Sequence, residues 1–551
     1  MDSLKENLSK LELSKIDLSK LDISTTVYYV VAAVVLGLAL GIIPLPGVRQ
    51  KGLPPGPPTI PFLGNTHLLP RRGIHLWFTE CARKYGPVFS LKIGSSNMVI
   101  LTSGHHVTQL FDKRSLYYSN RPPSYIIGEK VFGNDHPMFM DAGDRWRHRR
   151  KLYFQLLQEL KCNKDHVRII QAETAQLLRD ICLEPAGLML HPGRFSNSVI
   201  MTLVFGIRTP RYDTSHYLKV QKIMTDLSSL GEIGSTPPVD VMPILRYLPE
   251  RLWGNWKSNA EALRKDVQNT YGALVDQVLE RRKTIGSLDT FVDRLYDNQA
   301  KPPLTRHEIE IMCGNLLEGG TDTMATTVLT FLQAVARNPE IQAEAQREID
   351  SVTGSGRTPA WSDYEKLPYV NMVVKEVLRW RPPAPGAFPH LLAKDDVIDG
   401  MKIPAKSTVI VNIWGVHHDP ARYKAPEVFD PSRFRGKTEP ASVYANSGDY
   451  ENRDHFAFGT GRRICPGIHL AERGLFVAIA KILWGFNVAP KLDANGQPIP
   501  IDISPVTGYR DGFLNQCKNF EVDVTVRSEA HRATIMAEAT RAEVEVFGSY
   551  M

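Results

Sequence analysis

The chain has 551 residues, and its hydrophobic content of 43% is enough to build a large buried core. The 66 basic and 59 acidic residues leave a net charge of +7, and this mild excess, without a block of Lys or Arg, argues against a nucleic-acid-binding protein. The six cysteines are widely spaced with no CxxC pair, which argues against a disulfide framework or a zinc site and favours a reducing, cytosol-facing domain.

Residues 1–24 alternate Lys with Asp and Glu and are predicted to form a short polar tail. The next segment, 25–45, contains an uncharged apolar run from Val27 to Ile43, which as a helix spans roughly 26 Å and reaches across a bilayer core. The alternatives are a buried core helix and a cleaved signal peptide, although a signal peptide needs a short basic start and this run begins late. We therefore expect an uncleaved transmembrane anchor.

The charges on the two sides of this segment do not orient it, because basic residues before and after the apolar run are nearly balanced. Asn7-Leu8-Ser9 is a glycosylation acceptor motif. Asn7 is therefore a candidate glycosylation site if the tail is lumenal.

Proline dominates the stretch 46–60, which includes Leu53-Pro54-Pro55-Gly56-Pro57-Pro58. Proline at this density predicts a stiff extended hinge, with a plain linker as the alternative. Beyond it, residues 87–94 and 98–102 have the composition of two strands of a hairpin. The stretches 121–140 and 228–249 contain several Pro residues and are predicted to be irregular.

A long helix is predicted to begin at Thr305, where Glu308 completes a capping box, and to end near Arg337. Gly319-Gly320-Thr321-Asp322-Thr323 interrupts its pattern, and each glycine costs a helix roughly 1 kcal/mol. Such a cost has a reason if a flat ligand approaches the backbone or if a bulge opens the helix. The acid and the alcohol that follow are suited to carrying protons into an apolar cavity; ordinary helix packing is the alternative.

Two weaker patterns place a pair of residues one helical turn apart. Trp146 and Arg150 stand at the start of a basic run, and Glu376 and Arg379 lie on one helical face. A basic surface helix and a surface ion pair are the simpler interpretations of these patterns.

The strongest pattern surrounds one cysteine, in Phe458-Gly459-Thr460-Gly461-Arg462-Arg463-Ile464-Cys465-Pro466-Gly467. Its glycines permit tight turns that aim N–H groups at the sulfur, which stabilises a thiolate. Arg463 adds a positive charge suited to an anionic group of a cofactor. The alternative is a buried structural cysteine.

This stretch resembles the haem-binding loop of the cytochrome P-450 superfamily, whose five fixed positions are matched by Phe458, Gly461, Arg463, Cys465 and Gly467. The chain as a whole resembles fungal microsomal members of secondary-metabolite pathways. The resemblance implies a mainly α fold with a smaller β region, in a single haem domain at 61–525, followed by a polar C-terminal tail at 526–551. It also implies that the thiolate of Cys465 is the axial ligand of haem b.

The resemblance assigns further roles. Binding of the haem, including its propionates, is implied for Trp146, Arg150, Gly320, His390, Phe458, Arg463 and Gly467. Asp322 and Thr323 are the implied catalytic pair, although Met324 stands where the family has a hydroxyl residue. Glu376, Arg379 and Arg433, the last within Pro426–Phe434, are implied to form a buried charge cluster that supports the loop of Cys465.

The implied activity is a haem-thiolate monooxygenase that uses O2 and electrons from NADPH, supplied by NADPH-cytochrome reductase with cytochrome b5 as a second donor. The enzyme is expected in the endoplasmic reticulum membrane, with its catalytic domain facing the cytosol. A haem-thiolate isomerase or dehydratase without external electrons, and a non-catalytic haem-binding membrane protein, are the alternatives.

Two surfaces are expected to serve this activity. A small apolar or aromatic substrate, polyketide-like or terpenoid-like, is expected to contact Ile126, Val131, Phe132, Leu316, Ala384, Phe388 and Val506. A basic face for an acidic electron donor is expected from Arg147, Arg149, Lys151, Arg462 and Arg473.

Overall fold

The structure is a computed structural model that describes residues 28–29, 32–33, 36–37, 45–231, 235–297, 302–510 and 512–550. The predicted tail with Asn7 and most of the predicted anchor at 25–45 lie outside these residues. Within these ranges, no helix combines the length and the apolar character that a membrane span requires.

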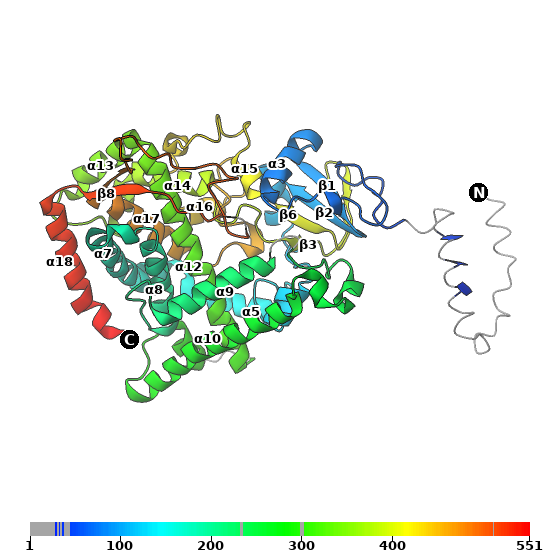
Figure 1. Ribbon diagram of the computed structural model, residues 1–551, viewed down its shortest axis with the longest axis horizontal. Helices are drawn as coiled ribbons and strands as arrows, with labels where there is room; N and C mark the ends of the chain where they lie inside the picture. Colours follow the sequence, from blue (N-terminus) through cyan, green and yellow to red (C-terminus); the bar gives the residue numbers. More distant parts are fainter. Residues whose placement is uncertain are drawn as a thin grey trace.

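Most of the regular structure in the described residues is helical, as expected for a mainly α fold (Figure 1). Their bounds are α3 (Ile74–Tyr85), α4 (Gly104–Val107), α5 (Asp144–Leu157), α6 (Glu159–Lys161), α7 (Val167–Leu183), α8 (His191–Phe205), α9 (Ser215–Gly231), α10 (Trp256–Thr284), α11 (Phe291–Asp297), α12 (Arg306–Arg337), α13 (Pro339–Thr353), α14 (Pro368–Trp380), α15 (Ile413–His417), α16 (Ala441–Ala445), α17 (Ile468–Gly485) and α18 (Glu529–Glu545).

The smaller β region centres on a four-stranded sheet of order β1-β2-β6-β3, which lies at the opposite end of the molecule from α18 (Figure 1). The predicted hairpin is confirmed by the antiparallel pairing of β1 with β2, and β6 joins β2 in parallel. The strand bounds are β1 (Val88–Ile93), β2 (Ser96–Leu101), β3 (His390–Leu391), β4 (Asp396–Ile398), β5 (Met401–Ile403), β6 (Thr408–Val411), β7 (Phe486–Pro490) and β8 (Val522–Val526).

Helix α12 is the central element of the helical part, and it packs against α8, α10, α14 and α17. The predicted capping box at Thr305 and Glu308 is present, and the helix ends at Arg337 as expected. The expected interruption at Gly319-Gly320 is wrong, because the helix is continuous through both residues. A Cβ on Gly320 would lie 2.9 Å from Cγ1 of Ile200, so this glycine permits the close approach of α8.

The segment 526–551 is not an extended polar tail, because most of it forms α18, which packs against α7. Ile535, Ala539 and Ala542 form a narrow buried stripe on this helix. The stripe is too small to stand out from a composition rich in charged residues, which explains why the packing was not predicted. The stretches 121–140 and 228–249 are also less irregular than expected, since they include a π-helix at Tyr125–Val131 and the end of α9.

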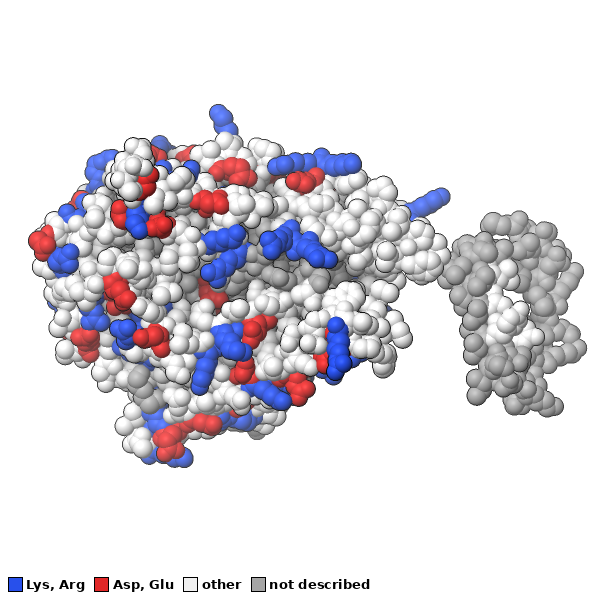
Figure 2. Space-filling model, viewed as in Figure 1, with Lys and Arg blue, Asp and Glu red and all other residues white. Residues whose placement is uncertain are grey.

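Surface charge is mixed on the face shown in Figure 2, where Lys and Arg side chains alternate with Asp and Glu. This distribution agrees with the nearly balanced composition of the chain.

Gly314 tests the packing of α12 against α10, because a Cβ there would lie 2.0 Å from the ring of the fully buried Tyr271. We expect Gly314→Ala to lower the free energy of unfolding by about 1–3 kcal/mol, since the ring has no free space to enter. Urea unfolding measures this loss. The control is Gly319→Ala, whose Cβ meets nothing within 4 Å and which should not destabilise the protein; equal losses in both variants would contradict this packing.

Candidate functional site

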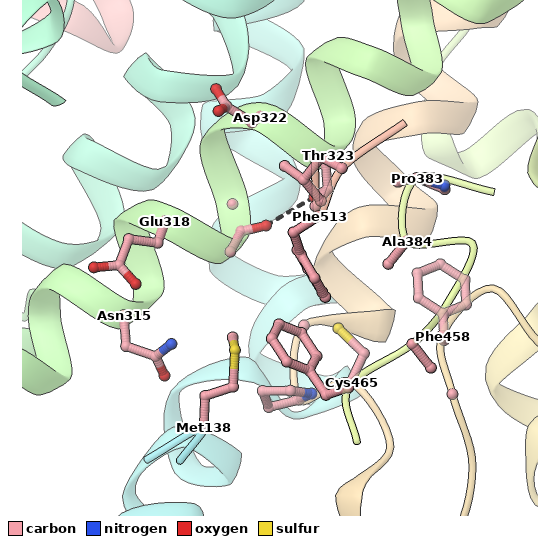
Figure 3. Close-up of a pocket in the computed structure, with 18 of the residues that line it drawn as sticks. Met138, Asn315, Glu318, Asp322, Thr323, Pro383, Ala384, Phe458, Cys465 and Phe513 are labelled. Atoms are coloured by element: carbon pink, nitrogen blue, oxygen red, sulfur yellow. Dashed lines mark hydrogen bonds between the residues drawn. The ribbon is translucent and has the colours of Figure 1, made fainter. Parts of the chain in front are cut away.

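A cavity of about 700 Å³ lies between α12 and the loop that precedes α17. Cys465 reaches it from the loop, and Thr323 reaches it from α12 on the opposite side (Figure 3). Phe458, Gly467, Trp146, Arg150 and His390 also line it; together with Gly320 and Arg463, all the cofactor-binding residues proposed from the sequence therefore border one cavity.

The loop of Cys465 has a backbone that demands glycine at one position. Gly461 has φ +63°, and a Cβ there would lie 2.0 Å from the carbonyl oxygen of Phe111. The N–H of Cys465 donates to the carbonyl of Phe458 at 2.9 Å, which closes the turn around the sulfur. The conformation therefore follows from the glycine and this hydrogen bond together.

The sulfur itself faces the cavity. Desolvation by the surrounding protein raises the pKa of the Cys465 thiol, while the N–H of Gly467 and the charge of Arg150 oppose that rise. A metal cation bound from the cavity side would supply the positive charge that favours the thiolate. The site therefore suits a cysteine ligand to a metal.

Arginines line the same cavity without acidic partners. The side chains of Arg121, Arg150 and Arg463 donate only to backbone carbonyls, for example from Arg463 Nε to Ser119 at 2.9 Å and from Arg121 Nη1 to Pro389 at 2.6 Å. Within the described chain, none of the three guanidinium groups has a carboxylate within 4.0 Å, although the backbone N–H of Arg121 donates to Asp141 at 3.0 Å. Such guanidinium groups fit an anionic ligand.

The pKa values of these arginines reflect their surroundings. Desolvation lowers the pKa of Arg121 to about 9 and that of Arg463 to about 10, and the charges of neighbouring arginines add to the effect. His390 beside them is buried, and desolvation keeps its pKa well below the usual range. Bound anionic groups would relieve the repulsion among these cations.

Trp146 contributes to the site by contacting Arg463, whose guanidinium lies 4.2 Å from the centre of the indole ring. This cation–π contact holds the arginine in place. Arg121 was missed by the sequence analysis, since it belongs to none of the motifs considered there and only the fold brings it next to Arg463.

The charge cluster expected around Glu376 is present but does not line the cavity. Arg379 donates to both oxygens of the buried Glu376 at 2.6 and 2.7 Å, and Arg433 Nε lies 3.4 Å from the same carboxylate. Arg379 also donates to the carbonyl of His417, whose Nε2 accepts the N–H of Phe456 at 2.7 Å. This path connects the cluster to the start of the Cys465 loop.

On α12, the acid and the alcohol face different directions. The hydroxyl of Thr323 lies at the cavity wall and donates to the carbonyl of Gly319 at 2.7 Å (Figure 3). Asp322 points away from Cys465 and accepts a hydrogen bond from Gln221 on α9 at 3.2 Å. Burial raises its pKa to about 6, so Asp322 exchanges its proton near neutral pH.

Four of the seven predicted substrate contacts line the cavity, namely Phe132, Leu316, Ala384 and Phe388. The other three do not. Ile126 and Val131 pack into the core because the π-helix turns Ile127 toward the cavity instead, and Val506 is 68% exposed. The missed lining residues include Met138, Phe139 and Phe513.

The predicted basic face also loses two members, because Arg149 and Arg473 are buried. Arg149 pairs with Glu308 on α12, and Arg473 lies 3.1 Å from Glu159. Arg147, Lys151 and Arg462 remain exposed. The sequence pattern did not separate these groups because burial of an arginine depends on partners distant in the chain.

Comparison with known proteins gives one consistent result. The family model described as Cytochrome P-450 matches residues 54–522. The chain is 60% identical over 474 residues to cytochrome P-450 monooxygenase anuE of Penicillium roqueforti, which covers 86% of this chain and 96% of that protein. It is 44% identical to monooxygenase yanC of Aspergillus niger, with 91% and 94% covered, and 42% identical to monooxygenase patH of Aspergillus clavatus, with 92% and 95% covered.

The raised pKa of Asp322 predicts a pH dependence of stability. Its pKa is about 6 in the folded protein against an ordinary value of 3.8, so the folded state binds a proton more tightly and stability falls as pH rises between these values. Asp322→Asn removes this loss. Relative to the parent protein, the variant should gain roughly 2 kcal/mol between pH 4 and pH 7.

Urea unfolding at several pH values measures this difference. Asp523→Asn, a change at an exposed strand residue, controls for the removal of one negative charge. A constant difference between the Asp322→Asn variant and the parent across this pH range would show that Asp322 is not desolvated.

Proposed function

Because the chain belongs to the cytochrome P-450 family and is a monooxygenase of that family, we propose that it inserts one atom of O2 into a small aromatic or apolar metabolite of a fungal secondary pathway. The observation that carries the proposal is the cavity in which Cys465 faces Thr323, beside three arginines without carboxylate partners. One oxygen atom enters a C–H bond of the substrate, and the other is reduced to water by two protons and two electrons that originate from NADPH.

The residues around the cavity fit haem b. Cys465 would ligate the iron, and Arg121, Arg150 and Arg463 would bind the two propionates through charged hydrogen bonds. Trp146 would hold Arg463, and His390 would complete the propionate side, while Phe458, Gly467 and Gly320 border the remaining space. When bound, the haem supplies the activation of O2 and the chemistry of oxygen insertion.

The protein's own part in the reaction is the control of protons. With a pKa of about 6, Asp322 accepts and releases protons at physiological pH, and its contact with Gln221 connects it to α9. Thr323 presents its hydroxyl oxygen at the cavity wall, where it can hold a water molecule by a hydrogen bond. The pair would therefore transfer protons from Asp322 to the oxygen-binding side of the cavity.

The aromatic lining of the cavity favours an aromatic substrate. Four phenylalanines line it, namely Phe132, Phe139, Phe388 and Phe513. Exclusion of water by such a wall protects the reactive species from side reactions. Glu376, Arg379 and Arg433 would act at a distance, by supporting the backbone that carries Cys465.

We further propose that the enzyme is a single-span protein of the endoplasmic reticulum membrane, with the segment 25–45 as anchor and 46–60 as hinge. Its domain would face the cytosol and receive electrons from NADPH-cytochrome reductase, with cytochrome b5 as a second donor. The exposed Arg147, Lys151 and Arg462 are suited to attract an acidic partner.

Cys465→Ala tests the ligand. The parent protein, reduced and treated with carbon monoxide, should show the long-wavelength Soret band of thiolate-bound haem, and the variant should lose it because no other cysteine among the described residues lines the cavity. Absorption spectra measure the band. Cys182→Ala should retain it, and a Cys465→Ala protein that keeps the band would refute the assignment.

Thr323→Ala tests the monooxygenase role through the coupling of NADPH to product. Haem binding and the carbon monoxide spectrum should be unchanged, because Cys465 is intact. Product formed per NADPH should fall several-fold and hydrogen peroxide should rise, since the hydroxyl that would hold a proton-carrying water at the cavity wall is lost.

The measurement uses the full chain reconstituted with reductase, NADPH and a metabolite extract, with products identified by mass. Asp322→Asn should slow the whole cycle instead, and Thr326→Ala, a buried change outside the cavity lining, serves as control. Unchanged coupling in Thr323→Ala would show that this hydroxyl has a packing role only.

A further inference from the structure

A buried polar cluster forms one wall of the otherwise apolar cavity. Glu318 on α12 accepts hydrogen bonds from His136 Nε2 at 2.8 Å and from the hydroxyl of Tyr271 at 2.7 Å. Glu318 and His136 both line the cavity, and Glu318 is only 8% exposed. The proton transfer proposed for Asp322 and Thr323 does not use this cluster.

The hydrogen bonds indicate which nitrogen of His136 carries the proton and which groups surround Glu318. The N–H of Met138 donates to Nδ1 of His136 at 3.3 Å, so the proton of the neutral ring is on Nε2 and is donated to Glu318. No Lys or Arg lies within 4.0 Å of Glu318 in the described chain, where His136 is its only basic neighbour. The cavity therefore has a desolvated acceptor that is not neutralised by a cation.

A hydrogen-bond donor stands beside it. Asn315 lies three residues before Glu318 on α12, so the two side chains share a helical face, and Figure 3 shows them next to each other. Asn315 lines the cavity, and its carboxamide forms no hydrogen bond with any described residue. The wall thus offers a free amide next to a carboxylate whose oxygens each keep an unused lone pair.

A hydroxyl group matches this pair, because it donates to a carboxylate and accepts from an amide at the same time. A substrate carboxylate would be repelled by Glu318, and a hydrocarbon would leave the amide of Asn315 unpaired and the remaining lone pairs of Glu318 unused.

The remaining walls favour a flat ring. Phe132 and Phe139 are stacked with an interplanar angle of 22°, and Phe388 and Phe513 have ring centres 4.0 Å apart. All four rings line the cavity. Aromatic side chains prefer offset or edge contacts with another aromatic ring.

We propose that Glu318 and Asn315 determine substrate specificity by binding a phenolic hydroxyl, so that the substrate class is a phenol. This rests on the proposed function, because it assigns the substrate of the same cavity. His136 and Tyr271 are positioning residues that hold the carboxylate of Glu318 toward the ligand.

Binding of four matched probes tests the proposal without turnover. The full-length haem-loaded protein is titrated with 4-propylphenol, 4-propylanisole, propylbenzene and 4-propylcyclohexanol, and calorimetry gives each dissociation constant. The phenol should bind at least about tenfold more tightly than the anisole, which lacks the donor hydrogen. It should also bind more tightly than the cyclohexanol, which has the hydroxyl without the aromatic ring.

Variants of Glu318 and Asn315 test whether these residues cause the preference for the phenol. Glu318→Gln should weaken binding of the phenol by about tenfold and leave propylbenzene nearly unchanged, because a hydrogen bond to a charged acceptor is replaced by one to a neutral amide. Glu310→Gln is the matched control, since Glu310 is on the same helix but does not line the cavity. Asn315→Leu should reduce the same preference and serves if Glu318→Gln fails to bind haem.

Equal affinity for phenol, anisole and propylbenzene, or an unchanged preference in the Glu318 and Asn315 variants, would overturn the proposal and leave the cluster a purely structural role. Equal affinity for phenol and cyclohexanol would overturn the aromatic class. None of these results bears on the carbon monoxide spectrum or on NADPH coupling, so failure of the proposed function is recognised separately.

Discussion

Three guanidinium groups converge on one cavity and receive no carboxylate from the described parts of the chain. The side chains of Arg121, Arg150 and Arg463 form hydrogen bonds only with backbone carbonyls, so their charges are available to a ligand. The sulfur of Cys465 faces the same space, and its thiolate also requires an external positive charge. A cofactor with a metal centre and anionic groups satisfies both requirements at once, and the surrounding structure keeps these groups in place.

Residues that do not line the cavity hold the loop of Cys465 in place. Asp112 accepts the N–H of Gly461 at 2.9 Å, and Arg453 donates to the carbonyl of Gly459 at 2.6 Å. The Glu376–Arg379 pair reaches the same loop through His417. Breaking a buried ion pair costs about 3–5 kcal/mol, so a change at Glu376 would affect the cofactor site although this residue touches no part of the cavity.

Helix α12 carries two acidic side chains near the cavity, and their different partners suggest different functions. Asp322 faces α9 and contacts Gln221, whereas Glu318, one turn earlier, faces α10 and His136. Because Glu318 and Asp322 are four residues apart, about one helical turn, both lie near the cavity. Their side chains bond to different neighbours and therefore do not contact each other. Thr323 lies apart from Glu318, on the side of Asp322 (Figure 3), so proton supply and substrate recognition can use different residues of α12.

The sequence by itself determined the features that depend on local rules. The capping box at Thr305, the hairpin of β1 and β2 and the glycine turns before Cys465 follow from residues close together in the chain. The motif around Cys465 also identified the family. Only the tertiary structure decided which side chains are neighbours and which are buried. It placed Arg121 beside Arg463 and joined Glu318 to His136 and Tyr271. It also buried Arg149 and Arg473 and exposed Val506. The direction and burial of a side chain depend on elements that are distant in sequence, and no local pattern contains that information.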